Sequence, residues 1–485
     1  MRLSDLIASD LSLPSDAAGT EIAGLTSDSR AVQPGFLFVA LKGVAADGAR
    51  FAADAVRRGA VAIVAAPGAL GSEIGVPVIE AVDPRLALAR MAARFYPLQP
   101  ERLVAVTGTS GKTSVAVFVR QIFKAAGFPA ASIGTIGVVS PAGAEYGSLT
   151  TPDPVALHQM LDRLAREGVT HAALEASSHG LDQRRLDGVR LVAAAFTNLG
   201  RDHMDYHPTV EDYFAAKLRL FTVLLPADGA AVVDMDGPYG ARVAEVARAR
   251  GQRLIDVGRN GAAIRLLSVT EHDDGQTLAL SVLGEAMSVD LPLRGGFQVS
   301  NALVAAGLAI GAGIAPAVAI AALAQLTGAP GRLERVGRTL SGGQIFIDYA
   351  HKPDALDVAL AALRPLAKGR LIVVFGAGGD RDAGKRPLMG AAASRQADLV
   401  IVTDDNPRSE DPATIRAAIL AAAPGAIEIG DRARAIGEAV AMLEAGDVLC
   451  IAGKGHETGQ IIAGEVHPFS DHEVVAAALA GERAA

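Results

Sequence analysis

Residues 104–114 read Val-Ala-Val-Thr-Gly-Thr-Ser-Gly-Lys-Thr-Ser, and this stretch decides the fold of the middle of the chain. An apolar run typical of a buried strand leads into a glycine-rich loop, which ends in Lys112 and Thr113. Glycines let backbone N–H groups approach phosphate oxygens, lysine supplies positive charge, and the threonine hydroxyl can hold Mg²⁺. Helical periodicity continues to Gly127, a typical helix end. The stretch therefore predicts a phosphate-binding strand–loop–helix unit.

The loop is a shortened form of the long Walker pattern, because position 106 holds valine where that pattern has glycine. We expect the whole loop to contact phosphate. Its residues are Thr107, Gly108, Thr109, Ser110, Gly111, Lys112 and Thr113.

Composition limits the possible functions. The 485 residues, half of them hydrophobic, suffice for about three domains with sizeable cores. A formal net charge of −8 argues against a nucleic-acid-binding protein. The single cysteine, Cys450, lies in an apolar run that predicts a buried strand, and one cysteine fits a reducing compartment. Without a leader pattern or an apolar run of about 20 residues, we expect a cytoplasmic protein with no membrane insertion.

Apolar runs alternating with helical patterns predict three α/β domains, over residues 1–95, 96–328 and 329–485. In the second domain, alternating residues over 264–293 predict a hairpin that turns at 273–275. The turn-rich stretch 328–331 is the expected boundary before the third domain. The third domain repeats strand and helix clearly enough to predict a parallel sheet with helices on both faces.

Each apolar strand of the third domain ends in a polar loop. These loops are residues 348–351 (Asp-Tyr-Ala-His), 376–382 (Gly-Ala-Gly-Gly-Asp-Arg-Asp), 404–408 (Asp-Asp-Asn-Pro-Arg) and 453–457 (Gly-Lys-Gly-His-Glu). Ligands of open α/β sheets bind beyond the carboxyl ends of the strands, so four such loops predict a second ligand site. NAD is disfavoured, because Arg381 stands at the third glycine position of a possible dinucleotide pattern.

Two polar segments follow strands of the second domain. The run 171–174 ends in Glu175, where a neighbouring strand can bring a carboxylate to the Mg²⁺ held by Thr113. The next strand leads into a dense polar loop in which His203 stands beside Asp202 and Asp205. We expect both segments at the phosphate-binding edge of the sheet.

Seven segments in order resemble the Mur ligase family. They are residues 107–113, 150–154 (Thr-Thr-Pro-Asp-Pro), 175–180 (Glu-Ala-Ser-Ser-His-Gly), 198–203 (Asn-Leu-Gly-Arg-Asp-His), 215–217 (Ala-Ala-Lys), 348–351 and 405–408 (Asp-Asn-Pro-Arg). The resemblance extends over all three predicted domains. It implies a three-domain Mur ligase architecture, with a small N-terminal α/β domain, a central P-loop-type ATPase domain and a C-terminal Rossmann-like parallel-sheet domain.

The resemblance also implies how ATP and Mg²⁺ are held. In the family the phosphate loop binds ATP and a strand glutamate, here Glu175, binds Mg²⁺. His203 would help to hold a second metal ion, and Lys217 matches a lysine that family members carry as a carbamate, an oxygen ligand suited to Mg²⁺. The implied catalytic residues are Lys112, Glu175, His203 and Lys217, and the metal ligands are Thr113, Glu175, His203 and carbamylated Lys217. Further ATP contacts implied by the family are Asn301, Arg332, Asp348 and His351.

Two more substrate sites follow from the resemblance. The family's contacts to a UDP-MurNAc-dipeptide correspond to Ser29, Val44, Ala45, Ala46, Thr150, Thr151, Ser177, Gln183 and Arg185. Its contacts to diaminopimelate correspond to Arg381, Asp405, Asn406, Pro407, Arg408, Gly453 and Glu457. Members that add meso-diaminopimelate carry Asp-Asn-Pro-Arg, and the arginine can pair bidentately with the extra carboxylate that lysine lacks.

The implied activity is ATP-dependent amide synthesis, in which the D-glutamyl carboxylate becomes an acyl phosphate and the amine of meso-diaminopimelate displaces phosphate. His179, His203 and the phosphate itself remain open as the group that takes the amine's proton. We expect a monomer that acts on small molecules, namely UDP-MurNAc-L-Ala-D-Glu, meso-diaminopimelate and ATP. The alternatives are a lysine-adding, other Mur or folylpolyglutamate-type ligase, or, in another class, a partner-regulated P-loop ATPase.

Overall fold

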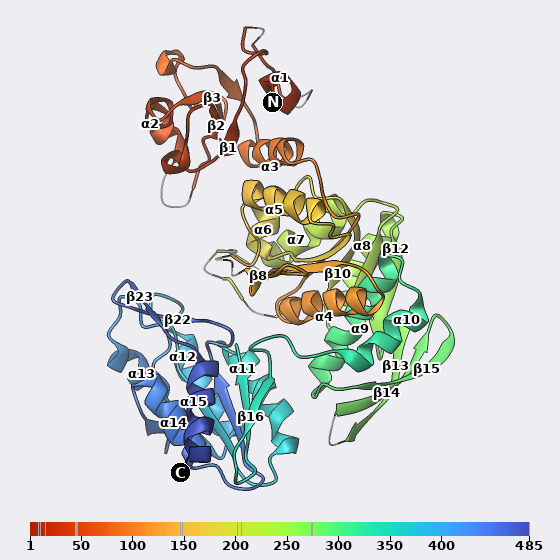
Figure 1. Ribbon diagram of the computed structural model, residues 1–485, viewed down its shortest axis with the longest axis vertical. Helices are drawn as coiled ribbons and strands as arrows, with labels where there is room; N and C mark the ends of the chain where they lie inside the picture. The colour runs from red at the N-terminus through yellow and green to blue at the C-terminus, as the bar shows by residue number, and fades with distance from the viewer. Residues whose placement is uncertain are drawn as a thin grey trace. The chain divides into compact units, whose positions relative to one another are not determined.

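Three main sheets organise the chain, and Figure 1 shows them in colours from red to blue along the sequence. The computed structural model describes residues 1–7, 9, 11–14, 16–43, 47–145, 147, 149–200, 202–204, 206–272 and 275–484. The chain divides into two compact units. Unit 1 comprises Met1–Val269, Leu278–Val289 and Ser300–Gln325, and unit 2 comprises Thr270–Thr277, Asp290–Val299 and Leu326–Ala485. No described helix is long and apolar enough to cross a lipid bilayer.

The first sheet of unit 1 is parallel and has the order β1-β2-β3-β4. Its elements are α1 (Leu3–Ile7), β1 (Gly24–Thr26), β2 (Phe36–Val39), α2 (Ala52–Arg57), β3 (Ala60–Ala65), β4 (Val78–Glu80) and α3 (Pro84–Phe95). Because strand side chains alternate between faces, Leu37 and Val39 pack with α1 and α3, whereas Phe38 packs with α2. Asp83 caps α3 by accepting the N–H of Leu86.

The second sheet has eleven strands in the order β15-β14-β13-β12-β11-β10-β5-β9-β6-β7-β8. Its strands are β5 (Arg102–Thr107), β6 (Ala130–Gly134), β7 (Gly137–Ser140), β8 (Gly143–Glu145), β9 (His171–Glu175), β10 (Leu191–Phe196), β11 (Ala230–Asp234), β12 (Arg253–Gly258), β13 (Ile264–His272), β14 (Gly275–Val282) and β15 (Glu285–Leu291). The helices are α4 (Lys112–Ala125), α5 (Pro154–Arg166), α6 (Ser178–Asp182), α7 (Val210–Arg219), α8 (Gly240–Ala249), α9 (Gly296–Gly311) and α10 (Pro316–Ala321).

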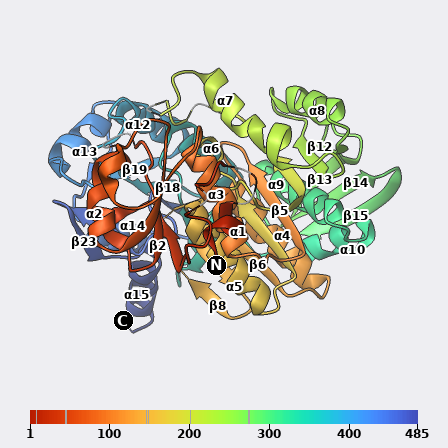
Figure 2. The ribbon, with the colours of Figure 1, turned by 90° about the horizontal axis from the view of Figure 1, so that it is seen from above.

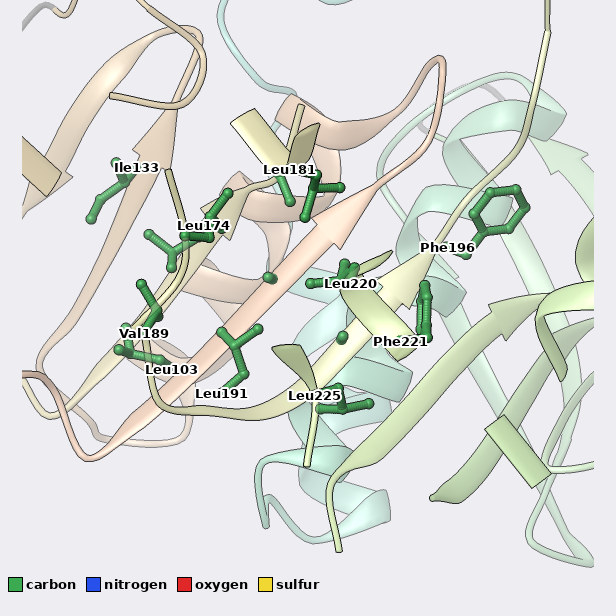
Figure 3. Packing of buried hydrophobic residues seen from close by; sticks show 14 of the residues in the cluster. Leu103, Ile133, Leu174, Leu181, Val189, Leu191, Phe196, Leu220, Phe221 and Leu225 are labelled. Atoms are coloured by element: carbon green, nitrogen blue, oxygen red, sulfur yellow. The ribbon is translucent and has the colours of Figure 1, made fainter. Parts of the chain in front are cut away.

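β5 lies between β9 and β10, and all three strands are parallel. Val106 is paired with Glu175 and Thr107 with Phe196, so the three carboxyl ends lie level at one edge. On one face of the sheet, the strand residues Leu103 and Leu174 belong to the same hydrophobic cluster as Leu220, which lies in the helical segment after α7 (Figure 3). α4 packs against β5, β6 and β9, and Figure 2 shows it beside β5 and β6. This packing fixes the strand ends that carry the expected phosphate site.

One expectation for this sheet is corrected. The region 264–293 forms three strands rather than a single hairpin, because a second tight turn occurs at Leu283 and Gly284, whose φ angles are 52° and 91°. The sequence Leu-Gly lacks the Asn or Asp that usually announces such a turn. The first expected turn includes residues 273 and 274, which lie outside the described residues. A π-helix over Leu220–Leu224 follows α7 directly in the chain.

The third sheet, in unit 2, has the order β16-β17-β21-β18-β19-β20 and is parallel except for the edge strand β16. Its strands are β16 (Glu334–Arg338), β17 (Gln344–Asp348), β18 (Leu371–Phe375), β19 (Leu399–Val402), β20 (Ile427–Glu428) and β21 (Val448–Ala452), and β22 (Gly459–Ile462) pairs separately with β23 (Glu465–Pro468). The helices are α11 (Pro353–Leu363), α12 (Lys385–Gln396), α13 (Pro412–Leu420), α14 (Arg432–Ala441) and α15 (Asp471–Ala484).

Alternating strand residues cover both faces of this sheet. Phe375 and Cys450 pack with α11, α12 and α13, whereas Val374 and Ile451 pack with α14 and α15. The predicted parallel sheet with helices on both faces is confirmed, as is the burial of Cys450 in a strand.

Candidate functional site

The predicted phosphate loop joins β5 to α4 in unit 1. Gly108 and Gly111 have φ angles of 151° and 89°, in the region that favours glycine. A Cβ on Gly111 would lie 2.3 Å from Oδ1 of Asn301, so the loop and this predicted ATP residue are in close approach. The Lys112 ammonium donates to the carbonyl oxygens of Gly108 at 2.9 Å and Thr109 at 3.0 Å. The positive charge of Lys112 therefore lies at the loop, where it can attract a phosphate group.

The segment after β10 is hydrogen-bonded to the phosphate loop. Thr197 donates to the carbonyl oxygen of Ser110 at 2.7 Å, and Oδ1 of Asn198 accepts the N–H of Ser110 at 2.9 Å. The N–H of Gly200 donates to Oγ1 of Thr109 at 2.9 Å. Thr197 and Asn198 were not among the predicted site residues, although Asn198 begins one of the seven family segments. The sequence feature that could have identified them is that both are polar residues directly after a buried strand.

Glu175 is enclosed at the end of β9, with 2% of its surface exposed. Oε2 accepts the hydroxyl of Thr113 at 3.1 Å, and the N–H of Thr135 donates to Oε1 at 2.8 Å. Thr135, which the sequence prediction missed, also exchanges a hydrogen bond with Thr150 at 3.0 Å. A Cβ on Gly134 would lie only 2.0 Å from Oε1 of Glu175, so glycine leaves the space that the carboxylate fills.

This pair of oxygen donors fits a magnesium ion. Among the described residues, no three His, Cys, Asp or Glu side chains are grouped closely enough to hold a metal by themselves. Mg²⁺ is usually bound by one or two protein oxygens together with phosphate oxygens and water. The hydroxyl of Thr113 and the carboxylate of Glu175 supply such a set next to the phosphate loop.

Lys217 on α7 is buried, with 1% exposure. Its Nζ donates to the carbonyl oxygen of Gly108 at 2.7 Å and lies 4.4 Å from the centre of the Tyr213 ring. Tyr213 in turn hydrogen-bonds to Thr109 at 3.2 Å. The predicted lysine is therefore in direct contact with the phosphate loop rather than on a solvated helix face.

His203 has a φ of 54°, a conformation that costs energy for a non-glycine residue and is often found at functional sites. Its Nε2 lies 3.2 Å from Oδ2 of Asp202. The His203 and His179 rings are 4.7 Å apart, and Tyr206 packs 4.0 Å from His179. Both histidines that the sequence left open as proton acceptors thus lie in one aromatic cluster.

Four residues predicted for the dipeptide substrate form a hydrogen-bonded group. Arg185 donates to the carbonyl oxygen of Thr151 at 2.7 Å and to Oε1 of Gln183 at 2.8 Å. Thr151 and Ser177 exchange a hydroxyl hydrogen bond at 3.0 Å. Burial lowers the pKa of Arg185 from its ordinary value.

A cavity of about 170 Å³ adjoins this group. Its lining residues are Ser27, Leu41, Arg85, Leu88, Leu149, Asp153, Pro154, Gln183 and Arg185. Ser29 is buried in a short 3₁₀ turn, Ser29–Ala31, two residues beyond the lining residue Ser27. Val44, Ala45 and Ala46, also predicted for the sugar nucleotide, lie outside the described residues.

Three residues predicted for ATP lie together in unit 2. Burial raises the pKa of the Asp348 carboxyl, although Arg332 and the N–H groups of Leu333 and Ala350 oppose this shift. Burial also lowers the pKa of His351 to about 3, so its ring is neutral at pH 7. Arg332 stacks over the ring of Tyr349 at 4.6 Å.

The residues predicted for the amino acid converge beyond β19 and β21. Nδ2 of Asn406 donates to Oε2 of Glu457 at 2.9 Å. A Cβ on Gly453, where φ is 114°, would lie 2.5 Å from Oδ2 of Asp405. That oxygen is buried and finds no hydrogen-bond partner within the described chain. The cluster therefore presents carboxylate and amide groups, which suit an ammonium.

Arg408 follows this cluster with a φ of 54°. Its Nη1 donates to the carbonyl oxygen of Gly379 at 2.6 Å, which ties it to the loop after β18. A Cβ on Gly379 would lie 2.0 Å from the carbonyl oxygen of Pro407, so the two loops touch through their backbones. Arg381 lies in the same loop with an exposed side chain. The geometry offers two guanidinium groups to an anionic part of a ligand.

Family models and known proteins match this chain along most of its length. Family models match residues 21–96 (Mur ligase family, catalytic domain), 106–309 (Mur ligase middle domain) and 331–455 (Mur ligase, glutamate ligase domain). The UDP-N-acetylmuramoyl-L-alanyl-D-glutamate--2,6-diaminopimelate ligase of Mesorhizobium japonicum is 62% identical over 97% of each chain. The ligase of the same name from Bradyrhizobium diazoefficiens is 61% identical over 99% of each chain.

Solved structures give the same result. A structure titled UDP-N-acetylmuramoyl-L-alanyl-D-glutamate--2,6-diaminopimelate ligase matches with a TM-score of 0.71 and 33% identity, over 100% of this chain and 99% of that one. The MurF ligase of Thermotoga maritima, solved with ADP, shares the fold at a TM-score of 0.62 and 19% identity, over 96% and 98% of the two chains. With three family models in order and relatives that match from end to end, this chain belongs to the Mur ligase family.

Proposed function

We propose that this protein is an ATP-dependent ligase that joins meso-diaminopimelate to the D-glutamyl residue of UDP-MurNAc-L-Ala-D-Glu. The observation that carries the proposal is 62% identity, over 97% of both chains, to a ligase whose name states both substrates. The phosphate loop, and the cluster of Asp405, Asn406 and Glu457 that we call the amino-acid cluster, carry the groups that we propose for this reaction. We also propose a cytoplasmic location and a monomeric state.

In the first step, an oxygen of the D-glutamyl side-chain carboxylate attacks the γ-phosphorus of ATP, the bond to ADP breaks, and an acyl phosphate forms. Lys112 and the loop N–H groups offset the charge that develops on the phosphate oxygens. Thr113 and Glu175 would hold Mg²⁺, which neutralises phosphate charge when bound. The other loop residues, Thr107 to Gly111, and Asn301 shape the nucleotide site, with Arg332, Asp348 and His351 as the unit 2 contacts.

In the second step, the neutral amine of diaminopimelate attacks the acyl carbon, the carbon–oxygen bond breaks, and phosphate leaves. An amine of this kind has an ordinary pKa of about 10.4, so it must lose a proton first. The imidazoles of His179 and His203, only 4.7 Å apart, are the side chains we propose for accepting it. No covalent bond to the enzyme is required.

For the amino acid, we propose that Asp405, Asn406 and Glu457 receive an ammonium group, with Gly453 and Pro407 shaping the backbone around it. Arg408 and Arg381 would receive the carboxylate that distinguishes diaminopimelate from lysine. For the sugar nucleotide, the proposed contacts are Ser29, Val44, Ala45, Ala46, Thr150, Thr151, Ser177, Gln183 and Arg185.

We also propose that Lys217 is carried as a carbamate. The amine is enclosed beside the phosphate loop, where a carbamate N–H can keep the 2.7 Å contact to Gly108 while its oxygens become available to a cation. Incubation with ¹³C-bicarbonate should give a carbamate carbon resonance that Lys217→Gln lacks. A spectrum identical for the two proteins would refute the modification.

The function is tested by phosphate release from ATP in the presence of UDP-MurNAc-L-Ala-D-Glu. Release should depend on meso-diaminopimelate and be weak with L-lysine, and mass spectrometry should find the tripeptide product. Equal activity with lysine would refute the role of Arg408 and leave the ligase reaction intact. ATP hydrolysis that ignores both substrates would refute the ligase proposal.

A further inference from the structure

A lysine side chain is completely enclosed in the amino-acid cluster of unit 2. Lys454, two residues after the end of β21, has 0% exposure. Its Nζ lies 3.1 Å from Oδ1 of Asn406 and 3.1 Å from Oε2 of Glu457. A buried ammonium is strongly unfavourable unless it is paired and hydrogen-bonded, and here both partners are residues proposed to bind the substrate.

The backbone around Lys454 turns the side chain inward. Its neighbours Gly453 and Gly455 have φ angles of 114° and 55°. A Cβ on Gly455 would lie 2.8 Å from Cβ of Tyr349, so the turn passes close to the loop after β17. A lysine is seldom enclosed in this way, and the sequence pattern did not single it out.

Three mutual hydrogen bonds join Lys454, Asn406 and Glu457. Oδ1 of Asn406 also accepts the N–H of Ile461 at 2.9 Å, which anchors the amide to β22. The Glu457 side chain keeps 32% exposure, so a ligand can reach its carboxylate although it cannot reach Lys454. The ammonium therefore acts on a ligand only through its two partners.

We propose that Lys454 is a positioning and specificity-determining residue for the amino-acid substrate. It fixes Asn406 and Glu457 in place and makes the Lys454–Glu457 pair neutral in net charge. Diaminopimelate, with two ammonium and two carboxylate groups, enters such a site without adding net charge, whereas lysine adds one positive charge. This inference rests on the proposed function and attributes part of the preference for diaminopimelate over lysine to Lys454.

The test compares Lys454→Met, which keeps the apolar stem, with the wild-type enzyme in the phosphate-release assay. We expect the KM for meso-diaminopimelate to rise about 10- to 100-fold, the loss expected when a hydrogen bond to a charged group is removed. The KM values for ATP and the UDP-dipeptide should stay within about twofold. The ratio of activity with diaminopimelate to activity with lysine should fall, because Glu457, without its ammonium partner, then favours a cation.

A matched control lies at the other end of β21. Arg370 pairs with the buried Asp447 at 2.6 Å, just before the strand begins. Arg370→Met therefore also breaks an ion pair of unit 2, away from the amino-acid cluster. It should lower the melting temperature without changing the KM for diaminopimelate or the selectivity ratio. Lys454→Gln, which can still donate a hydrogen bond without a charge, is the second variant.

The possible outcomes separate this inference from the function on which it rests. A wild-type enzyme that does not respond to diaminopimelate refutes the proposed function and this role with it. A responsive wild type, with unchanged KM and selectivity in Lys454→Met, refutes only the role of Lys454. Failure of both variants to fold, or equal losses in every kinetic parameter, would make Lys454 purely structural and would also overturn the inference.

Discussion

Replacing Gly134 by alanine should displace the carboxylate that we propose as a magnesium ligand. The new Cβ would lie 2.0 Å from Oε1 of Glu175 and 2.5 Å from its Cδ, whereas ordinary contacts begin near 3.4 Å. The carboxylate must therefore move by more than about 1 Å, since the strand β6 holds the backbone of residue 134. Such a movement breaks the 2.8 Å bond from the N–H of Thr135 and the 3.1 Å bond from Thr113.

Two magnitudes follow from this displacement. Overpacking of this kind lowers the free energy of unfolding by about 1–3 kcal/mol. A misplacement of about 1 Å near reacting groups reduces kcat by about 100-fold. We expect both effects in Gly134→Ala, together with a higher Mg²⁺ concentration for half-maximal activity. Urea unfolding measures the first effect, and phosphate release at varied Mg²⁺ measures the others.

Gly437→Ala is the matched control, because it is also a glycine-to-alanine change, in α14, and its Cβ would meet no atom within 4 Å. It should keep full activity and stabilise the helix by about 0.5–1 kcal/mol. If Gly134→Ala kept kcat within about threefold of wild type with an unchanged Mg²⁺ requirement, the proposed role of Glu175 would be wrong.

Three further changes test other parts of the molecule. Arg408→Ala should raise the KM for diaminopimelate by about 10- to 100-fold and leave activity with lysine almost unchanged. Equal losses of activity with diaminopimelate and with lysine, measured in parallel assays, would contradict the assigned carboxylate contact. Asp471→Ala leaves Arg432 buried without its 2.7 Å partner and should lower the unfolding free energy of unit 2 by about 3–5 kcal/mol in urea titrations, whereas a loss below about 1 kcal/mol would show that the pair is dispensable. The hydrogen bond to Glu334 raises the pKa of His472. The contact therefore stabilises the folded state fully below the imidazole's ordinary pKa of about 6.5, and this stabilisation is lost as pH rises through the raised pKa. Urea unfolding between about pH 6 and 9 should show this loss of stability in the wild type and not in His472→Gln.

Local signals in the sequence were sufficient for much of the fold. The strand, glycine loop and helix around Lys112 are contiguous, so their geometry follows from residues next to one another. The parallel sheet of unit 2 was equally readable, because each strand is a separate apolar run. The turn at Leu283 was missed because its residues are atypical for the conformation that they adopt.

Contacts between distant segments explain what the sequence did not reveal. Thr135 reaches Glu175 across forty positions, and Thr197 reaches Ser110 across eighty-seven. Neither residue type signals a role by itself, since threonine is common in strands and loops. Lys454 was missed for the opposite reason, because lysine normally indicates a surface position and only the fold encloses it.

The hydrogen bonds from Thr197, Asn198 and Gly200 to the phosphate loop have a consequence for the kinetics of nucleotide binding. They join protein groups alone, so they can hold the loop in one shape without help from a ligand. A receptor that is already ordered loses little conformational entropy when its ligand binds, so more of the contact energy remains as affinity. Association need not wait for a rearrangement of the loop, and we expect the on-rate of ATP to be governed by diffusional encounter rather than by loop closure.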